Sequence, residues 1–292
     1  MNFVGVDLAW GPKNATGLAA LDPAGRLVES LTVATDAEIL SFLDRNLPSD
    51  GVVAIDAPLV VPNETGQRVA EKLIGQTFGA YGASAHTANR SNPHFCPPRG
   101  AVLAERADLD IDPAHRPGPC HRSCIEVYPH PAMVALFGLS YVIPYKQKQG
   151  RDLEQLRTAN QRLLVLMERH CGPILRLEDS SRWAEIHEVV SRAVTKSALR
   201  SVEDEVDAIF CAFLAWMWGT DNDRMQVHGD VHTGYMVTPA ITALVPSPAI
   251  PGAVGRGEAK REMLRAVIRS SVPSLSEREV DDLVTAILPM MT

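Results

Sequence analysis

The chain has 292 residues, of which 46% are hydrophobic and 22% are charged, with a net charge of −7. This length and apolar content suffice for a large buried core and exclude a disordered or fibrous protein. The negative charge gives no general attraction to nucleic acid or acidic membranes, so a polyanion would need a local basic patch.

Several features indicate a cytoplasmic protein without a membrane segment. The N-terminus MNFVGVDLAW lacks the basic region and the cleavage site of a signal peptide. The longest uncharged apolar run, Ala208 to Trp218, is shorter than the roughly 20 residues that span a bilayer. Five cysteines at irregular spacings favour a reducing compartment over a disulfide framework.

The first sixty residues alternate strand and helix signals. Apolar β-rich runs, turn residues and one amphipathic stripe predict these elements: strands at 2–8, 16–21 and 26–34, a helix at 37–46 that is capped by Asp36 and ended by Pro48, and a strand at 52–55. The first three strands form an antiparallel meander. Because a helix separates the fourth strand from them, it can return parallel to the first.

The segment from Tyr81 to Arg122 has no sustained period and predicts a long functional loop. Its arginines would supply the local basic patch beside a phosphate site: Arg90, Arg99, Arg106, Arg116 and Arg122. It also holds residues that either bind zinc or are unpaired loop residues: His94, Cys96, Cys120, His121 and Cys124.

The second half is mainly helical. Its predicted elements are a strand at 125–128, helices at 131–137, 151–170, 183–199 and 201–218, and short strands at 225–227 and 235–237. We assign residues 1–240 to one domain with 81–122 as an insertion, 241–257 to a linker, and 258–292 to a helical tail. The tail helices, at 258–270 and 276–288, would pack on the body or mediate a homo-oligomer contact.

The strand and helix order describes an RNase H-like α/β fold, in which a mixed sheet is flanked by helices. In that layout Asp7 ends the first strand, Asp56 ends its parallel neighbour, and both lie at one edge of the sheet. Asp204 and Asp207 share one face of the last long helix, and Glu126 lies at the start of the short strand in the stretch IEVYP, directly after Ile125. Carboxylates that converge in this way need cations between them, and oxygen ligands suit Mg²⁺ or Mn²⁺.

Most of these acids also have a structural interpretation. Asp204 stands at a capping-box position after Ser201, Asp56 could cap a turn, and Asp7 could cap the turn that follows it. Glu126 could pair with Arg122 or with a lysine near Tyr145. Asp207 resists such an interpretation, because it lies inside an apolar helix where a charge is costly.

The chain resembles the domain-of-unknown-function family 429, described as predicted nucleases of RNase H-like fold. The resemblance covers about Met1 to Pro239 and rests on these stretches: GVDLAWGPKNATGLAAL, VVAIDAPL, CPPRGAVL, IEVYPHPAMVALFGL, YKQKQGR and DEVDAIFCAFLAW. It implies that the presumed active site comprises Asp7, Asp56, Glu126, Asp204 and Asp207. It predicts nothing for the tail after Gly257.

The leading hypothesis is a nuclease with two metal ions about 4 Å apart at the scissile phosphate. Asp7 would bridge the ions, Asp56 and Asp207 would complete the ligand set, and Asp204 and Glu126 would be weaker ligands. Lys146 would neutralise charge on the phosphate, with Lys148 and Arg151 beside it, or is a solvated loop cation. The alternatives are a phosphotransferase of the actin-like and sugar-kinase group and a catalytically idle binding module. The type of nucleic acid is not indicated.

Overall fold

The structure is a computed structural model that describes residues 1–9, 11, 14–47, 49–242, 245–246, 248, 264–265, 268–269, 272 and 275–287. The chain divides into two compact units, Met1–Pro246 and Ser247–Thr292. Across the described residues, no helix has both the length and the apolar character needed to cross a membrane.

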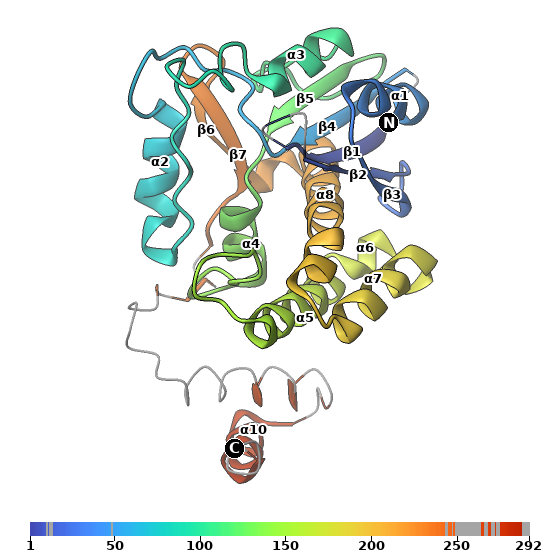
Figure 1. The fold of residues 1–292 in the computed structure, drawn as a ribbon, viewed down its shortest axis with the longest axis vertical. Coiled ribbons are helices and arrows are strands. Elements are labelled where there is room, and N and C mark those ends of the chain that lie inside the picture. Colours follow the sequence, from blue (N-terminus) through green and yellow to red (C-terminus); the bar gives the residue numbers. More distant parts are fainter. Residues whose placement is uncertain are drawn as a thin grey trace. The chain divides into compact units, whose positions relative to one another are not determined.

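The larger unit contains a five-stranded mixed sheet, in the order β3-β2-β1-β4-β5 (Figure 1). Neighbours among β1, β2 and β3 are antiparallel, whereas β4 is parallel to both β1 and β5. The strands are β1 (Asn2–Asp7), β2 (Thr16–Leu21), β3 (Leu27–Val33), β4 (Gly51–Ile55) and β5 (Arg122–Glu126). The predicted α/β class, a meander joined to parallel strands, is confirmed and is consistent with the RNase H-like layout.

Helices flank this sheet, and a hairpin that follows them in the chain forms a second, two-stranded sheet (Figure 1). The helices of the larger unit are α1 (Asp36–Asn46), α2 (Val69–Phe78), α3 (Arg99–Arg106), α4 (Pro129–Phe137), α5 (Leu153–His170), α6 (Gly172–Leu175), α7 (Ser181–Arg192) and α8 (Lys196–Thr220). The hairpin consists of β6 (Met225–Asp230) and β7 (Gly234–Pro239).

Helices α1 and α8 cover opposite faces of the sheet. Glu29 of β3 lies beside Arg45 of α1, whereas the next residue, Ser30, donates a hydrogen bond to Glu205 of α8. Successive side chains of a strand point to opposite faces, so the two helices lie on different sides. Helix α8 packs across β1, β2 and β4.

Two glycines let α8 approach the sheet closely. A Cβ atom on Gly5 of β1 would lie 2.0 Å from the carbonyl oxygen of Ala208, and one on Gly17 of β2 would lie 1.8 Å from that of Asp204. No side chain fits in either space. The glycines therefore set how near the acidic residues of α8 come to the strand ends.

We expect Gly5→Ala to destabilise the protein by about 2 to 3 kcal/mol, because the added methyl group would overlap helix backbone that cannot rotate away. Gly75→Ala is the matched control. Gly75 lies inside α2, and a methyl group added there would meet no atom within 4 Å, so this change should be neutral or stabilise by up to about 1 kcal/mol. Urea denaturation of both variants measures the difference, and equal stabilities would contradict the close packing.

Two predicted helix starts are corrected. The helices predicted at 183–199 and 201–218 correspond to α7 and α8, but the break between them lies earlier, because α7 ends at Arg192 and α8 begins at Lys196. Thr195 is the N-cap of α8, and its side chain accepts a hydrogen bond from the backbone N–H of Ala198. The N-cap of α1 is Thr35 rather than Asp36, since Thr35 forms a capping box with Glu38.

The predicted loop at 81–122 is more ordered than expected. It contains α3, and its last residue, Arg122, already belongs to β5. Helix α2, before this segment, was not predicted, although its buried residues Ala70, Ile74 and Phe78 recur every four positions. Pro48 and most of the turn at 10–14 lie outside the described residues.

The second unit contains α10 (Glu277–Ile287), which corresponds to the helix predicted at 276–288. Four apolar side chains form its small core: Leu264, Ile268, Val280 and Val284. Most of the predicted linker at 241–257 and most of the helix predicted at 258–270 lie outside the described residues.

Candidate functional site

Asp7 and Asp56 meet where two parallel strands end. Asp7 is the last residue of β1, and Asp56 directly follows β4 and donates its backbone N–H to the carbonyl of Val6 at 2.9 Å. Asp7 lies two residues beyond Gly5 and therefore shares its face, which is the face covered by α8. The predicted edge position of both residues is thus observed.

The acids of α8 lie close enough to Asp7 to change its ionisation. Burial raises the pKa of Asp7 well above its usual value, and repulsion from Asp207, Asp56 and Asp204 raises it further, while Lys146 opposes these effects. Burial likewise raises the pKa of Asp56 to about 7, with Lys146 again opposing it. The structure therefore brings four of the predicted acids, and Lys146, into one carboxylate pocket.

Asp207 is the most enclosed member of the pocket. Its side chain is 0% exposed, and the hydroxyl of Tyr145 donates a hydrogen bond of 2.8 Å to its Oδ1. The Nζ of Lys146 lies 2.7 Å from Oδ2, in an ion pair without good hydrogen-bond direction. Burial lowers the pKa of Lys146, but Asp207, Tyr145 and Asp7 outweigh it and hold this pKa well above its usual value. Lys146 is therefore charged at neutral pH.

Glu203 belongs to the same neighbourhood and was not predicted. Burial raises its pKa to about 7, and repulsion from Asp207 adds to the shift. Glu203 lies four residues before Asp207, so one turn of α8 separates them on a shared face. That spacing in the stretch EDEVD was the signal that could have identified it.

The capping alternative for Asp204 is wrong, because α8 begins at Lys196 and Ser201 lies inside the helix. The hydroxyl of Ser201 donates a hydrogen bond to the carbonyl of Ala198 instead. Burial raises the pKa of Asp204, with Asp207 as the next contributor. Asp204 therefore does not cap a helix, and its ionised form is disfavoured by burial and by repulsion from Asp207.

Glu126 is held by a buried arginine. Nη2 of Arg68 lies 2.7 Å from its Oε1, and Nη1 lies 2.9 Å from its Oε2, which also accepts the backbone N–H of Leu59 at 2.8 Å. Arg68 in turn bonds Glu71, and all three charged side chains are buried. The alternative partners suggested for Glu126, Arg122 or a lysine near Tyr145, are not the ones observed. The oxygens of Glu126 instead tie the segment after Asp56 to β5.

The segment 92–100 covers the residues next to the acids. Arg99 donates a hydrogen bond of 2.7 Å to the carbonyl of Ala9 and pairs with Asp36. A small pocket beside it is lined by Leu8, Ala9, Ala57, Pro58, His94, Phe95, Pro98, Arg99 and Gly100. Both strand-end segments, after Asp7 and after Asp56, therefore contact this part of the insertion.

The basic patch expected from the arginines of segment 81–122 is partly neutralised by acidic neighbours. Arg90 lies near Glu64, Arg99 pairs with Asp36, and Arg122 lies 3.9 Å from Asp44. The candidate zinc residues also separate: His121 bonds Asp110, Cys96 and Cys120 are exposed, and Cys124 is buried. Within the described ranges, no three His, Cys, Asp or Glu side chains are arranged to hold a metal ion.

The carboxylate pocket nevertheless has the donor chemistry of a Mg²⁺ or Mn²⁺ site. Its candidate ligands are all carboxylate oxygens, which these hard cations prefer. The raised pKa values of Asp7 and Asp56 mean that their ionised forms are disfavoured and are stabilised by positive charge, which Lys146 now supplies. The residues therefore fit such a cation chemically, and a ligand set forms only when their side chains rearrange around it.

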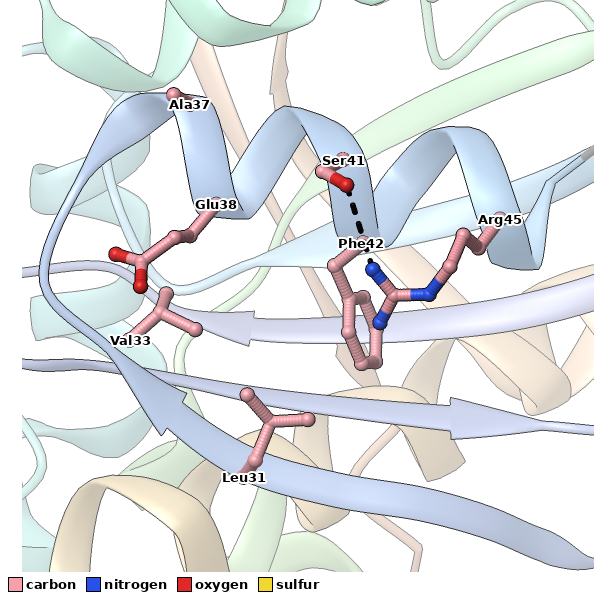
Figure 2. A pocket seen from close by; sticks show the side chains of 7 residues that line it. All are labelled: Leu31, Val33, Ala37, Glu38, Ser41, Phe42 and Arg45. Atoms are coloured by element: carbon pink, nitrogen blue, oxygen red, sulfur yellow. Dashed lines mark hydrogen bonds between the residues drawn. The ribbon is translucent and has the colours of Figure 1, made fainter.

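A wider groove lies between α1 and β3 and has a volume of about 400 Å³ (Figure 2). Leu31, Val33 and Phe42 give it apolar walls, and Arg45 lies over the Phe42 ring. Glu38 is held by the cap of α1. None of the pocket acids lines this groove, so it offers no comparable chemistry.

The pH dependence of stability tests the raised pKa of Asp56. An unfolded Asp titrates near pH 4, whereas folded Asp56 titrates near pH 7, so the folded state binds more protons between these values. We therefore expect the unfolding free energy in EDTA to fall as pH rises from about 5 to 7. Asp56→Asn should flatten that fall by up to about 1.4 kcal/mol per pH unit. Asp223→Asn, an exposed control, should leave it unchanged.

The fold and site define an α/β protein with a carboxylate pocket at the ends of adjacent parallel strands. Residues 5–233 match the model of a family described as a protein of unknown function, DUF429, and the chain belongs to this family. The family resemblance seen in the sequence is thereby confirmed, and the pocket lies inside the matched residues. Searches of curated proteins and of solved structures gave no match.

Proposed function

We propose that the protein is a divalent-metal-dependent phosphodiesterase that hydrolyses nucleic acid. The observation that carries this proposal is the gathering of Asp7, Asp56 and Asp204 around the buried Asp207, whose charge raises the pKa of each of the other three. Carboxylates that destabilise one another's ionised forms are typical of functional sites, and a bound cation would stabilise those ionised forms.

Each pocket residue has a role in this reaction. Asp7, Asp56 and Asp207 would hold Mg²⁺ or Mn²⁺, with Asp204 and the newly identified Glu203 at the margin. The cation, when bound, lowers the pKa of water and stabilises charge on the phosphate. Lys146 would neutralise a phosphate oxygen, and Tyr145 holds Asp207 in place through its 2.8 Å hydrogen bond. Glu126 is assigned to positioning the segment after Asp56 rather than to direct ligation.

Metal binding and hydrolysis together test the proposal. Mn²⁺ that binds only the folded state should stabilise it by roughly 2.7 kcal/mol at a hundredfold excess over the dissociation constant. Thermal melts with Mn²⁺ and with EDTA measure this effect. Assays with single-stranded and double-stranded DNA and RNA, and with bis(p-nitrophenyl) phosphate, identify the substrate. No melting shift together with no hydrolysis would refute the function.

A further inference from the structure

We propose that Lys146 is the resident cation of the carboxylate pocket, and that a divalent metal ion enters only by displacing its ammonium group. This inference rests on the proposed function and adds to it a competition between a side chain and the metal. It predicts that the site in the metal-free protein is closed by the chain itself.

The contacts of Lys146 carry the first step. Its Nζ lies 2.7 Å from an oxygen of Asp207, a side chain with no solvent exposure. The charge of Lys146 also lowers the pKa values of four neighbouring acids: Asp7, Asp56, Asp204 and Glu203. The ammonium group of Lys146 therefore stabilises the ionised forms of all these carboxylates.

The second step is that the ammonium group and a metal ion need the same place. A Mg²⁺ ion binds oxygens at about 2.0 to 2.1 Å and demands near-octahedral geometry. An oxygen of Asp207 that contacts Nζ of Lys146 at 2.7 Å has this cation beside it already. Two cations that share one carboxylate oxygen would also repel each other strongly in a buried site.

The third step is that Lys146 can leave while its neighbours stay. Its side chain is 30% exposed, so it has a path to solvent, and it lies between α4 and α5, outside any helix or strand. Tyr145 is anchored separately, because its hydroxyl bonds Asp207 and its carbonyl accepts a hydrogen bond from Asn160. Rotation of the lysine side chain alone would therefore open the pocket.

Calorimetric titration with Mn²⁺ tests the competition, with Lys146→Gln as the test variant. This variant should bind Mn²⁺ at least tenfold more tightly than the parent. Lys72→Gln is the matched control, since it removes the same charge from an exposed position on α2 and should change the affinity less than twofold. Unchanged or weaker binding by Lys146→Gln, with the parent binding normally, would overturn the inference and leave the proposed function standing. No binding by any variant would refute both.

Reductive methylation of the unaltered protein provides a second test that does not depend on a variant folding. Peptide mapping by mass spectrometry would compare labelling at Lys146 in EDTA and in saturating Mg²⁺. Displacement predicts at least threefold faster labelling of Lys146 with Mg²⁺ and no change at Lys72. Equal or slower labelling of Lys146, under conditions in which Mg²⁺ raises the melting temperature, would overturn the inference.

Discussion

Asp7→Asn is expected to lower metal-dependent hydrolysis at least about 100-fold while leaving the metal-free protein as stable as the parent or more so. Asparagine keeps the shape of the side chain but cannot ionise. The ionised carboxylate of Asp7 is disfavoured in the metal-free protein, because burial and three neighbouring carboxylates raise its pKa. The same change removes a central metal ligand of the proposed site. Denaturation in EDTA and hydrolysis assays in Mn²⁺ measure the two effects.

The opposite signs make this substitution decisive. If Asp7 instead stabilises the fold as a cap or an ion-pair partner, Asp7→Asn leaves donors unpaired and costs about 1 to 3 kcal/mol in EDTA. Clear destabilisation without metal would therefore remove Asp7 from the site. An Asp223→Asn control shows the effect of the same chemical change at an exposed position.

Arg68→Met is expected to destabilise the protein by about 3 to 5 kcal/mol, the largest stability effect predicted for this chain. The substitution leaves Glu126 and Glu71 buried without their cation, and it also removes the donor to the carbonyl of Val60. Chemical denaturation at neutral pH measures the loss.

Arg192→Met is the control for that experiment. Arg192 pairs with Glu188 on the surface of α7, with side chains 80% and 58% exposed, so its loss should change stability by less than about 0.5 kcal/mol. Adding Glu126→Gln to Arg68→Met should recover part of the loss, because it removes one of the stranded charges. Similar losses for Arg68→Met and Arg192→Met would show that the buried network contributes little.

The parts of the site that lie on regular elements were predictable from the sequence. Asp7 ends one short apolar strand and Asp56 follows another, and two parallel strands that are neighbours must bring their ends together. Asp207 lies within an apolar stretch of helix, where burying its charge costs free energy unless the charge is compensated. This cost indicated a functional residue. Local pattern and fold topology were sufficient for these residues.

Long-range side-chain pairing was not predictable in the same way. Glu126 was placed with the other acids, but Arg68, 58 residues earlier, takes both its oxygens. Nothing in the spacing of these two residues indicates the pairing. The contact between Lys146 and Asp207 joins a loop to a helix, so its 2.7 Å geometry depends on how both pack and could only come from the structure.

The close fit of α8 against β1 has a consequence for how the chain folds during synthesis. Lys196, the first residue of α8, follows Asp7 by 189 residues. At about 5 to 20 residues per second, roughly 10 to 40 seconds separate the emergence of the first strand from that of its covering helix. During this interval the glycine-bearing face of the meander has no α8 to cover it. The nascent chain is therefore expected to depend on chaperones until α8 has been made, and the carboxylate pocket can form only after that step.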